Sequence, residues 1–156
     1  MKNPSIILAP ISIGELFDKL TILEIKRKKI EGNQLNNIKK EIIQLEEVIK
    51  NNNLEIDNKI FSDLEKINFG LWEIEDKIRI KDSKNEFDQE FIDLAKSVYK
   101  ENDKRATLKK EINLKYDSFL IEKNYTKVLY SFSRFIFRNL YIKLIKRITL
   151  YSHSKY

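Results

Sequence analysis

Apolar side chains recur every three or four residues along most of the chain, the spacing that places them on one face of an α-helix. This pattern predicts four helices, over residues 13–31, 35–50, 57–81 and 87–120. Short polar connectors separate them, as between antiparallel neighbours. The chain is therefore predicted to be all-α, an antiparallel helical bundle of about four helices.

Local signals mark the first helix and interrupt the third. Ser12 followed by Glu15 is a capping box, in which two residues satisfy each other's free backbone N–H groups, so the first helix should begin at Ile13. Gly32 should end it. Gly70 lies inside the third helix, where it costs about 1 kcal/mol relative to Ala. A glycine kept at that cost indicates that another backbone or a ligand approaches closely there.

The fourth predicted helix, 87–120, is longer than the others. At about 1.5 Å per residue it would be roughly 50 Å long, more than its neighbours can cover. Part of it should therefore be covered by the C-terminal tail or by a second subunit, which makes a homodimer one expected arrangement.

The apolar face of this long helix is interrupted by polar residues. They are Asn102, Arg105, Lys109 and Asn113. Burying such groups without partners would cost several kcal/mol, so partners are expected on the other helices. The candidates are Glu15 and Asp18 on the first helix and Glu75, Asp76 and Arg79 on the third. The sequence thus predicts a polar cluster inside the bundle.

Two interpretations of this cluster remain open. In the first, acids and bases neutralise one another and fix the register of the helices, as buried ion pairs can. In the second, Arg105 and Lys109 bind a carboxylate or phosphate while Asn102 and Asn113 orient it.

A metal site is a further alternative. Glu15, Asp18, Glu75 and Asp76 offer the oxygen ligands that Mg²⁺ prefers, and helical enzymes that hydrolyse nucleotides use similarly spaced acidic pairs. Cofactors other than Mg²⁺ are not expected. The chain has no Cys, its only His is His153 near the C-terminus, and it has no Gly-rich phosphate loop, so thiol, Ser-His and P-loop chemistry are excluded.

The positive net charge of +6 comes from the C-terminal tail. After Glu122 there are eight basic residues and no acidic one, together with eight aromatic residues. We therefore predict a helical domain over 1–124 and a basic, aromatic-rich extension over 125–156. Residues 125–150 could contact a membrane surface or a protein, although their uncharged stretches are too short to span a bilayer. Nucleic-acid binding is less favoured because no base-reading motif accompanies the charge. The expected location is cytoplasmic, peripheral to the inner membrane if the tail binds lipid.

Three ordered segments carry most of the polar residues singled out above. They read PISIGELFDKLTILEIKRKKI, LWEIEDKIR and FIDLAKSVYKENDKRATLKKEIN. They resemble the hallmark segments of a family of small bacterial helical proteins of unknown function. Genes of that family often lie beside glycosyltransferase genes in loci for lipopolysaccharide or other surface polysaccharides. The resemblance covers about residues 6–125.

The resemblance implies a setting but no reaction. It suggests an accessory or ligand-binding protein of surface-polysaccharide biosynthesis, whose polar cluster receives an anionic ligand such as a sugar nucleotide or a phosphate. The residues expected to bind this ligand are Asp18, Lys19, Trp72, Arg79, Asn102, Arg105, Lys109 and Asn113.

Overall fold

The described part of the chain, residues 7–121 of a computed structural model, contains four helices and no strand. The helices are α1 (Ile13–Lys29), α2 (Asn33–Asn51), α3 (Asn58–Ser83) and α4 (Gln89–Lys115). The predicted all-α class is confirmed.

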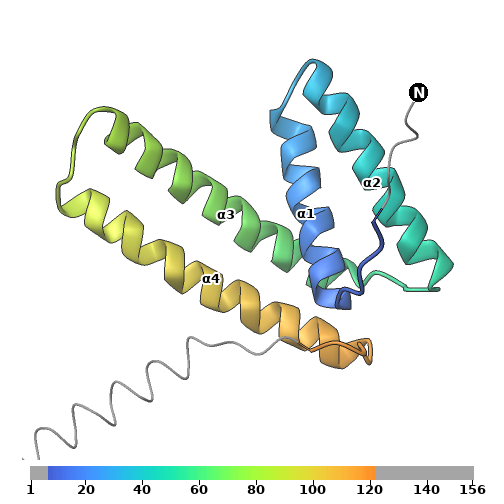
Figure 1. The fold of residues 1–156 in the computed structure, drawn as a ribbon. Coiled ribbons are helices and arrows are strands. Elements are labelled where there is room, and N and C mark those ends of the chain that lie inside the picture. Colours follow the sequence, from blue (N-terminus) through green and yellow to red (C-terminus); the bar gives the residue numbers. More distant parts are fainter. Residues whose placement is uncertain (1–6, 122–156) are drawn as a thin grey trace, which may run out of the picture. The chain divides into compact units, whose positions relative to one another are not determined.

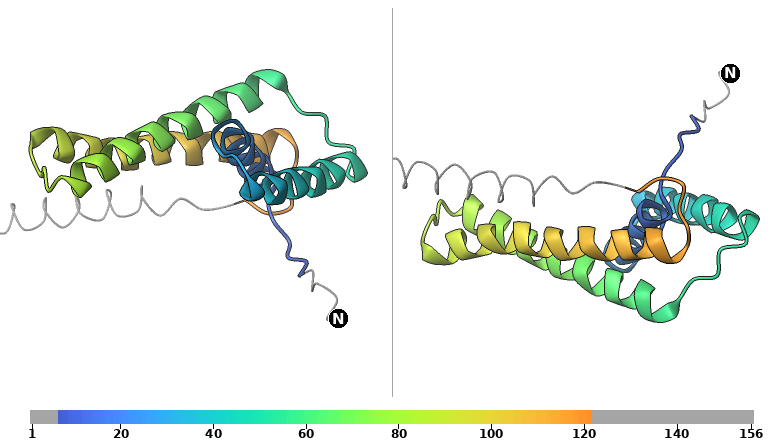
Figure 2. Two further views of the ribbon diagram at one scale, coloured as in Figure 1. Left: turned by 90° about the horizontal axis from the view of Figure 1, so that it is seen from above. Right: turned by 90° about the horizontal axis from the view of Figure 1, so that it is seen from below.

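The helices form two antiparallel hairpins, α1–α2 and α3–α4 (Figure 1). Helix α1 packs on both α3 and α4, and α2 packs on α1. Figure 2 shows α1 nearly end-on while α3 and α4 are seen lengthwise, so α1 crosses the α3–α4 hairpin steeply. Helix α1 covers the start of α3 and the end of α4. The end of α3 and the start of α4 form a projecting half of the hairpin that α1 does not cover.

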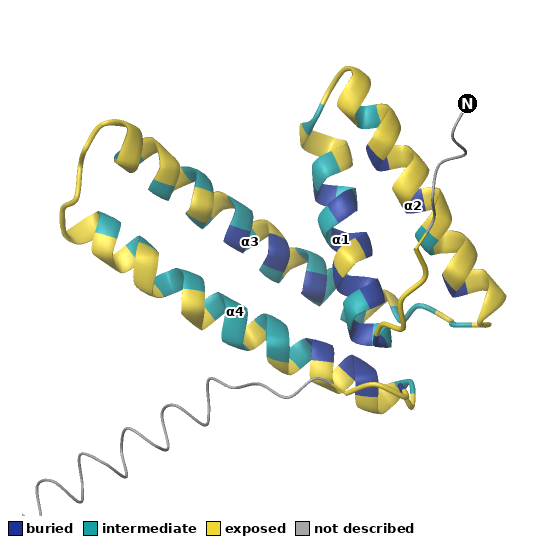
Figure 3. Cartoon of the chain, in the orientation of Figure 1, coloured by how far each residue is buried: buried dark blue, intermediate teal, exposed yellow. Residues whose placement is uncertain are grey.

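The core lies at this crossing (Figure 3). Its buried apolar side chains come from all four helices and are Leu16, Phe17, Leu20, Leu23, Ile38, Ile42, Ile49, Leu64 and Ile112. The Phe17 ring, 1% exposed, meets the rings of Phe61 and Tyr116 edge to face, with centroids 6.5 and 5.3 Å away. Buried residues of α3 and α4 are confined to the halves that α1 covers.

Acidic N-caps begin the two long helices. The Asp57 side chain accepts hydrogen bonds from N–H groups in the first turn of α3, and Asp88 accepts one from Phe91 in α4. The neighbouring Lys115 is the main cause of the lowered pKa of Asp57. The backbone N–H of Phe91, and then the ammonium of Lys81, lower the pKa of Asp88. Both caps are thus stabilised as carboxylates.

The long helix is shorter than predicted, because it spans Gln89–Lys115 and not 87–120. It is 27 residues long against 26 for α3, so it has no overlong part. Asp88 caps its start. At its end the backbone turns at Asp117, with φ 49°, and the Ser118 N–H returns to the Asn113 carbonyl. Phe119, which would continue the apolar spacing of a helix reaching residue 120, is consequently 98% exposed.

The basic extension over 125–156 lies outside the described residues, so the predictions made for it are not addressed by this structure. Within residues 7–121, no helix is both long enough and apolar enough to cross a membrane.

The close backbone approach expected at Gly70 is found at Gly14 instead. A Cβ added to Gly70 would have nothing within 4 Å. A Cβ on Gly14 would lie 2.6 Å from the backbone oxygen of Lys109 and 2.9 Å from Asn113 Oδ1. Only glycine therefore lets the start of α1 lie this close to α4.

Alanine substitutions at the two glycines should have opposite effects. Gly14→Ala should lower the free energy of unfolding by about 1–3 kcal/mol, because helix α4 must move away. Gly70→Ala should raise it by about 0.5–1 kcal/mol, because it removes backbone entropy from a helix without a steric conflict. Urea unfolding followed by circular dichroism measures both. Equal effects at the two positions would contradict this assignment of the close contact.

Candidate functional site

The predicted polar cluster exists, and its centre is Asp18 on α1. Its side chain is 2% exposed and receives the Arg105 guanidinium of α4 in a two-point contact. Arg105 Nε donates to Oδ1 at 2.9 Å and an Nη donates to Oδ2 at 2.6 Å. Asn68 of α3 donates to the same Oδ1 at 2.9 Å. One carboxylate thus joins α1, α3 and α4.

Thr21 and Asn102 complete the surroundings of this carboxylate. Thr21 Oγ1 donates to the Asp18 carbonyl at 2.8 Å and accepts from Asn68 Nδ2 at 2.8 Å. Asn102 accepts from Arg105 at 3.3 Å, from one turn earlier on α4. Hydrogen bonds thus orient both the Asp18 carboxylate and the Arg105 guanidinium. This arrangement restricts the movement of α1 relative to α4.

A second set of contacts lies one turn before Asp18, at the start of α1. The Lys109 ammonium of α4 contacts the Glu15 carboxylate. The Gly14 N–H donates to Asn113 Oδ1 at 2.6 Å, and the Ile13 N–H donates to Ser118 Oγ at 3.2 Å. Residues of α4 and its following turn therefore satisfy backbone donors that a helix start leaves open.

Asn113 carries one unsatisfied group. Its side chain is 1% exposed, and its Nδ2 is buried without a hydrogen-bond partner in the part of the chain described. Its Oδ1 is committed to Gly14. The residue was predicted to orient a ligand, and the structure gives it the role of a cap on α1.

Six of the predicted site residues do come together. They are Glu15, Asp18, Asn102, Arg105, Lys109 and Asn113. Sequence reasoning did not select Asn68, Thr21 or Gly14 for the site. The available signal for Asn68 was an amide on the stripe of α3 that also carries Trp72.

The other predicted site residues lie elsewhere. Lys19 is exposed and pairs with Glu41 of α2 at 2.7 Å. On α3, Arg79 pairs with Glu75 and Asp76 of its own helix, each at 2.8 Å, with all three side chains about half exposed. Glu75, Asp76 and Arg79 belong to the part of α3 that α1 does not cover, so they do not contact the Asp18 cluster.

The predicted metal ligands are not assembled either. Within residues 7–121 no three His, Cys, Asp or Glu side chains group as a metal site would require. Glu15 and Asp18 each face a cation from α4, and Glu75 and Asp76 face Arg79. The four carboxylates are thus engaged with three different cations and are not grouped around one position.

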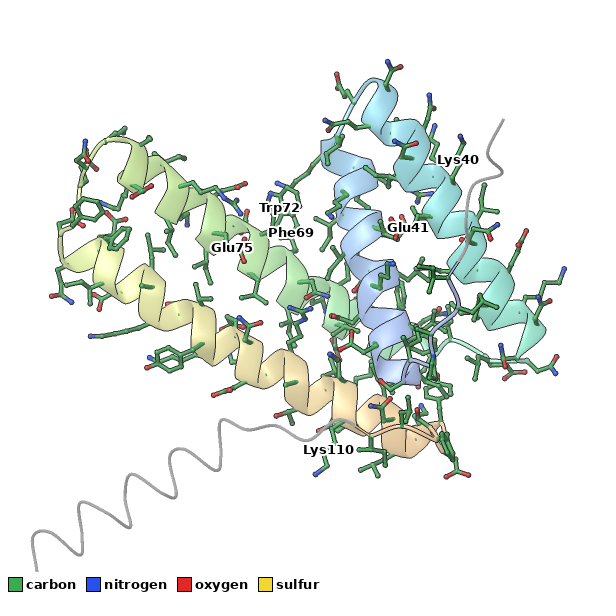
Figure 4. The ribbon with its side chains drawn as sticks, in the orientation of Figure 1. Lys40, Glu41, Phe69, Trp72, Glu75 and Lys110 are labelled. Atoms are coloured by element: carbon green, nitrogen blue, oxygen red, sulfur yellow. The ribbon has the colours of Figure 1, made fainter. Side chains whose placement is uncertain are left out.

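A cavity of about 300 Å³ lies between the end of α1 and α3. Its lining residues are Ile25, Lys28, Lys29, Glu65, Lys66 and Phe69. Figure 4 shows Phe69 and Trp72 on the side of α3 nearest the end of α1. The Lys29 ammonium lies 4.9 Å from the Phe69 ring centre and 6.0 Å from that of Trp72. Such contacts contribute about 0.5–1 kcal/mol when exposed. We call this cavity the α1–α3 groove.

Fold and cluster together define a small α-helical protein of two hairpins that cross and are joined by ion pairs, one of which has a buried carboxylate. The chain belongs to the family of unknown function DUF6165, whose model matches residues 7–136. Neither a curated protein nor a solved structure matches the chain.

The contribution of the Asp18–Arg105 ion pair to the free energy of unfolding can be measured with a double-mutant cycle. Arg105→Ala should lower the free energy of unfolding by about 3–5 kcal/mol, because it leaves the buried Asp18 carboxylate without its partner. Asp18→Ala should lower it less, because the Arg105 side chain that it leaves is 28% exposed and can be hydrated. The double variant should lose less than the sum, with a coupling of about 1–3 kcal/mol.

Arg79→Ala is the matched control for that cycle. It removes an arginine from two ion pairs that are exposed and lie within one helix, so its effect should stay within about 1 kcal/mol. A loss at Arg79 as large as that at Arg105 would contradict a special role for the buried pair.

Proposed function

We propose that the protein is a non-catalytic accessory protein of surface-polysaccharide biosynthesis that binds a small anionic component of that pathway. The polysaccharide setting rests on the resemblance of its three segments. A cytoplasmic location, where activated sugar precursors are available, belongs to the same proposal.

One observation carries the non-catalytic part of this proposal. The Asp18 carboxylate is held by Arg105 and Asn68, while Glu15 is held by Lys109. A ligand anion at this cluster would have to displace a buried carboxylate from its arginine, at a cost of several kcal/mol. The cluster is therefore better suited to fixing the two hairpins than to chemistry on a substrate.

The cations best placed for a ligand lie in the α1–α3 groove. Lys28, Lys29 and Lys66 line it together with Glu65. Lys28 pairs with Glu65 at 2.6 Å and Lys66 pairs with Asp63 at 3.4 Å, whereas Lys29 forms no salt bridge within the described residues. The last turn of α1 also carries Lys26 and Arg27, of which Arg27 pairs with Glu24 at 2.6 Å. This concentration of positive charge supports an anionic ligand at the groove rather than at the buried cluster.

The test uses the full-length protein with UDP-glucose as the probe, with and without Mg²⁺. Calorimetry should show binding, and the phosphorus NMR spectrum of the bound probe should show no cleavage over hours. Asp76→Asn, which removes a predicted Mg²⁺ ligand whose side chain is about half exposed, should leave the spectrum unchanged.

Two results would contradict the proposal. Mg²⁺-dependent cleavage that Asp76→Asn abolishes would favour a hydrolase. Absence of binding to UDP-glucose and to inorganic phosphate alike would remove the anionic ligand.

A further inference from the structure

The α1–α3 groove combines an apolar floor with a cationic rim. Ile25, 2% exposed, forms part of the floor, and the Phe69 ring stands 39% exposed beside it. Three lysines and one glutamate form the rim. A wholly polar anion would not bury the apolar floor, whereas an uncharged apolar ligand would make no electrostatic contact with the lysines.

The ammonium of Lys29 is the group most readily turned toward a ligand. In the described part of the chain it lies against the rings of Phe69 and Trp72 and in no salt bridge. Arg105 and Lys109, in contrast, already contact carboxylates of α1. An incoming anion can thus attract Lys29 away from the rings without breaking an ion pair.

Movement of Lys29 would also uncover the two rings. The exposed face of Phe69, with Trp72 beside it, then offers a surface on which a planar ring can stack. The cavity of about 300 Å³ is at the lower end for small-molecule sites, so it has room for one base, and the rest of a larger ligand would lie outside it.

We infer that the α1–α3 groove binds the nucleotide part of its ligand, with the base against Phe69 and Trp72 and the phosphate at Lys29 and Lys66. This inference deepens the proposed function and rests on it, since it gives the anionic ligand a chemical class and a place. Lys28 keeps Glu65 as its partner at 2.6 Å and so borders the site with little net charge. Lys66 contacts Asp63 at the longer distance of 3.4 Å, and both of these side chains are exposed, so Lys66 can turn toward the phosphate.

The only tryptophan of the chain, Trp72, lies next to this groove, with its ring centre 6.0 Å from the Lys29 ammonium, and so reports on it. Titration of the full-length protein with UMP should therefore quench tryptophan fluorescence to saturation. Uridine, glucose 1-phosphate and inorganic phosphate each lack either the phosphate or the base, and each should bind at least about tenfold more weakly.

Variants locate the binding. Lys29→Glu and Phe69→Ala should each weaken UMP binding by about tenfold or more, the scale of one charge-assisted hydrogen bond or one stacked ring. Lys110→Glu is the matched control, because Lys110 is exposed on α4 and points away from the other helices in Figure 4. It makes the same change of charge and should leave the affinity within about twofold.

Thermal unfolding of every variant confirms that the fold is retained, since Lys29 and Phe69 are exposed. Equal binding of UMP and inorganic phosphate would overturn the inference, because it would show a general cation patch. Unchanged UMP affinity in both groove variants would place the ligand elsewhere, which overturns the inference and leaves the proposed function standing.

Discussion

The packing of three helices in this structure depends on one buried carboxylate that they share. Asp18 cannot be solvated where it lies, so the free energy of the folded chain depends on Arg105 and Asn68 meeting it in the observed geometry. Apolar packing alone tolerates rotation and sliding of helices, whereas a two-point contact between arginine and carboxylate does not. The ion pair therefore fixes how α1 crosses the α3–α4 hairpin.

The start of α1 adds a steric condition to this electrostatic one. Gly14 lies against the backbone of Lys109, and the Gly14 N–H is capped by Asn113. Because α1 is held so closely at its beginning, the position of its other end is determined too. That end carries Lys28 and Lys29 and forms the α1–α3 groove with α3. The buried cluster thus shapes the surface that we propose binds a ligand.

Much of the fold could be predicted from sequence because it depends on local signals. Apolar spacing identified the four helices, and Ser12 marked the start of α1, where its hydroxyl accepts from the Glu15 N–H at 3.1 Å. The end of α4 could not be predicted, because its apolar spacing continues to Phe119. The helix ends earlier through a tertiary contact, the bond of Ser118 to the start of α1.

Only part of the candidate site could be predicted, because its contacts also depend on where the helices cross. Polar residues on the apolar face of α4 needed partners, and this requirement correctly selected Asp18 and Glu15. On α3, however, the same stripe carries both Asn68 and the Glu75, Asp76 and Arg79 group, and spacing cannot say where along α3 another helix crosses. The crossing lies at Asn68, so the residues farther along remain in solvent.

Amide hydrogen exchange in the Arg105→Ala variant tests most directly whether this ion pair holds α1 in place. If it does, amides of α1 should lose protection by about a hundredfold relative to the unsubstituted protein, as expected for a loss of about 3 kcal/mol. Amides in the projecting half of α3 and α4 should change much less. Unchanged protection of α1 would contradict the account.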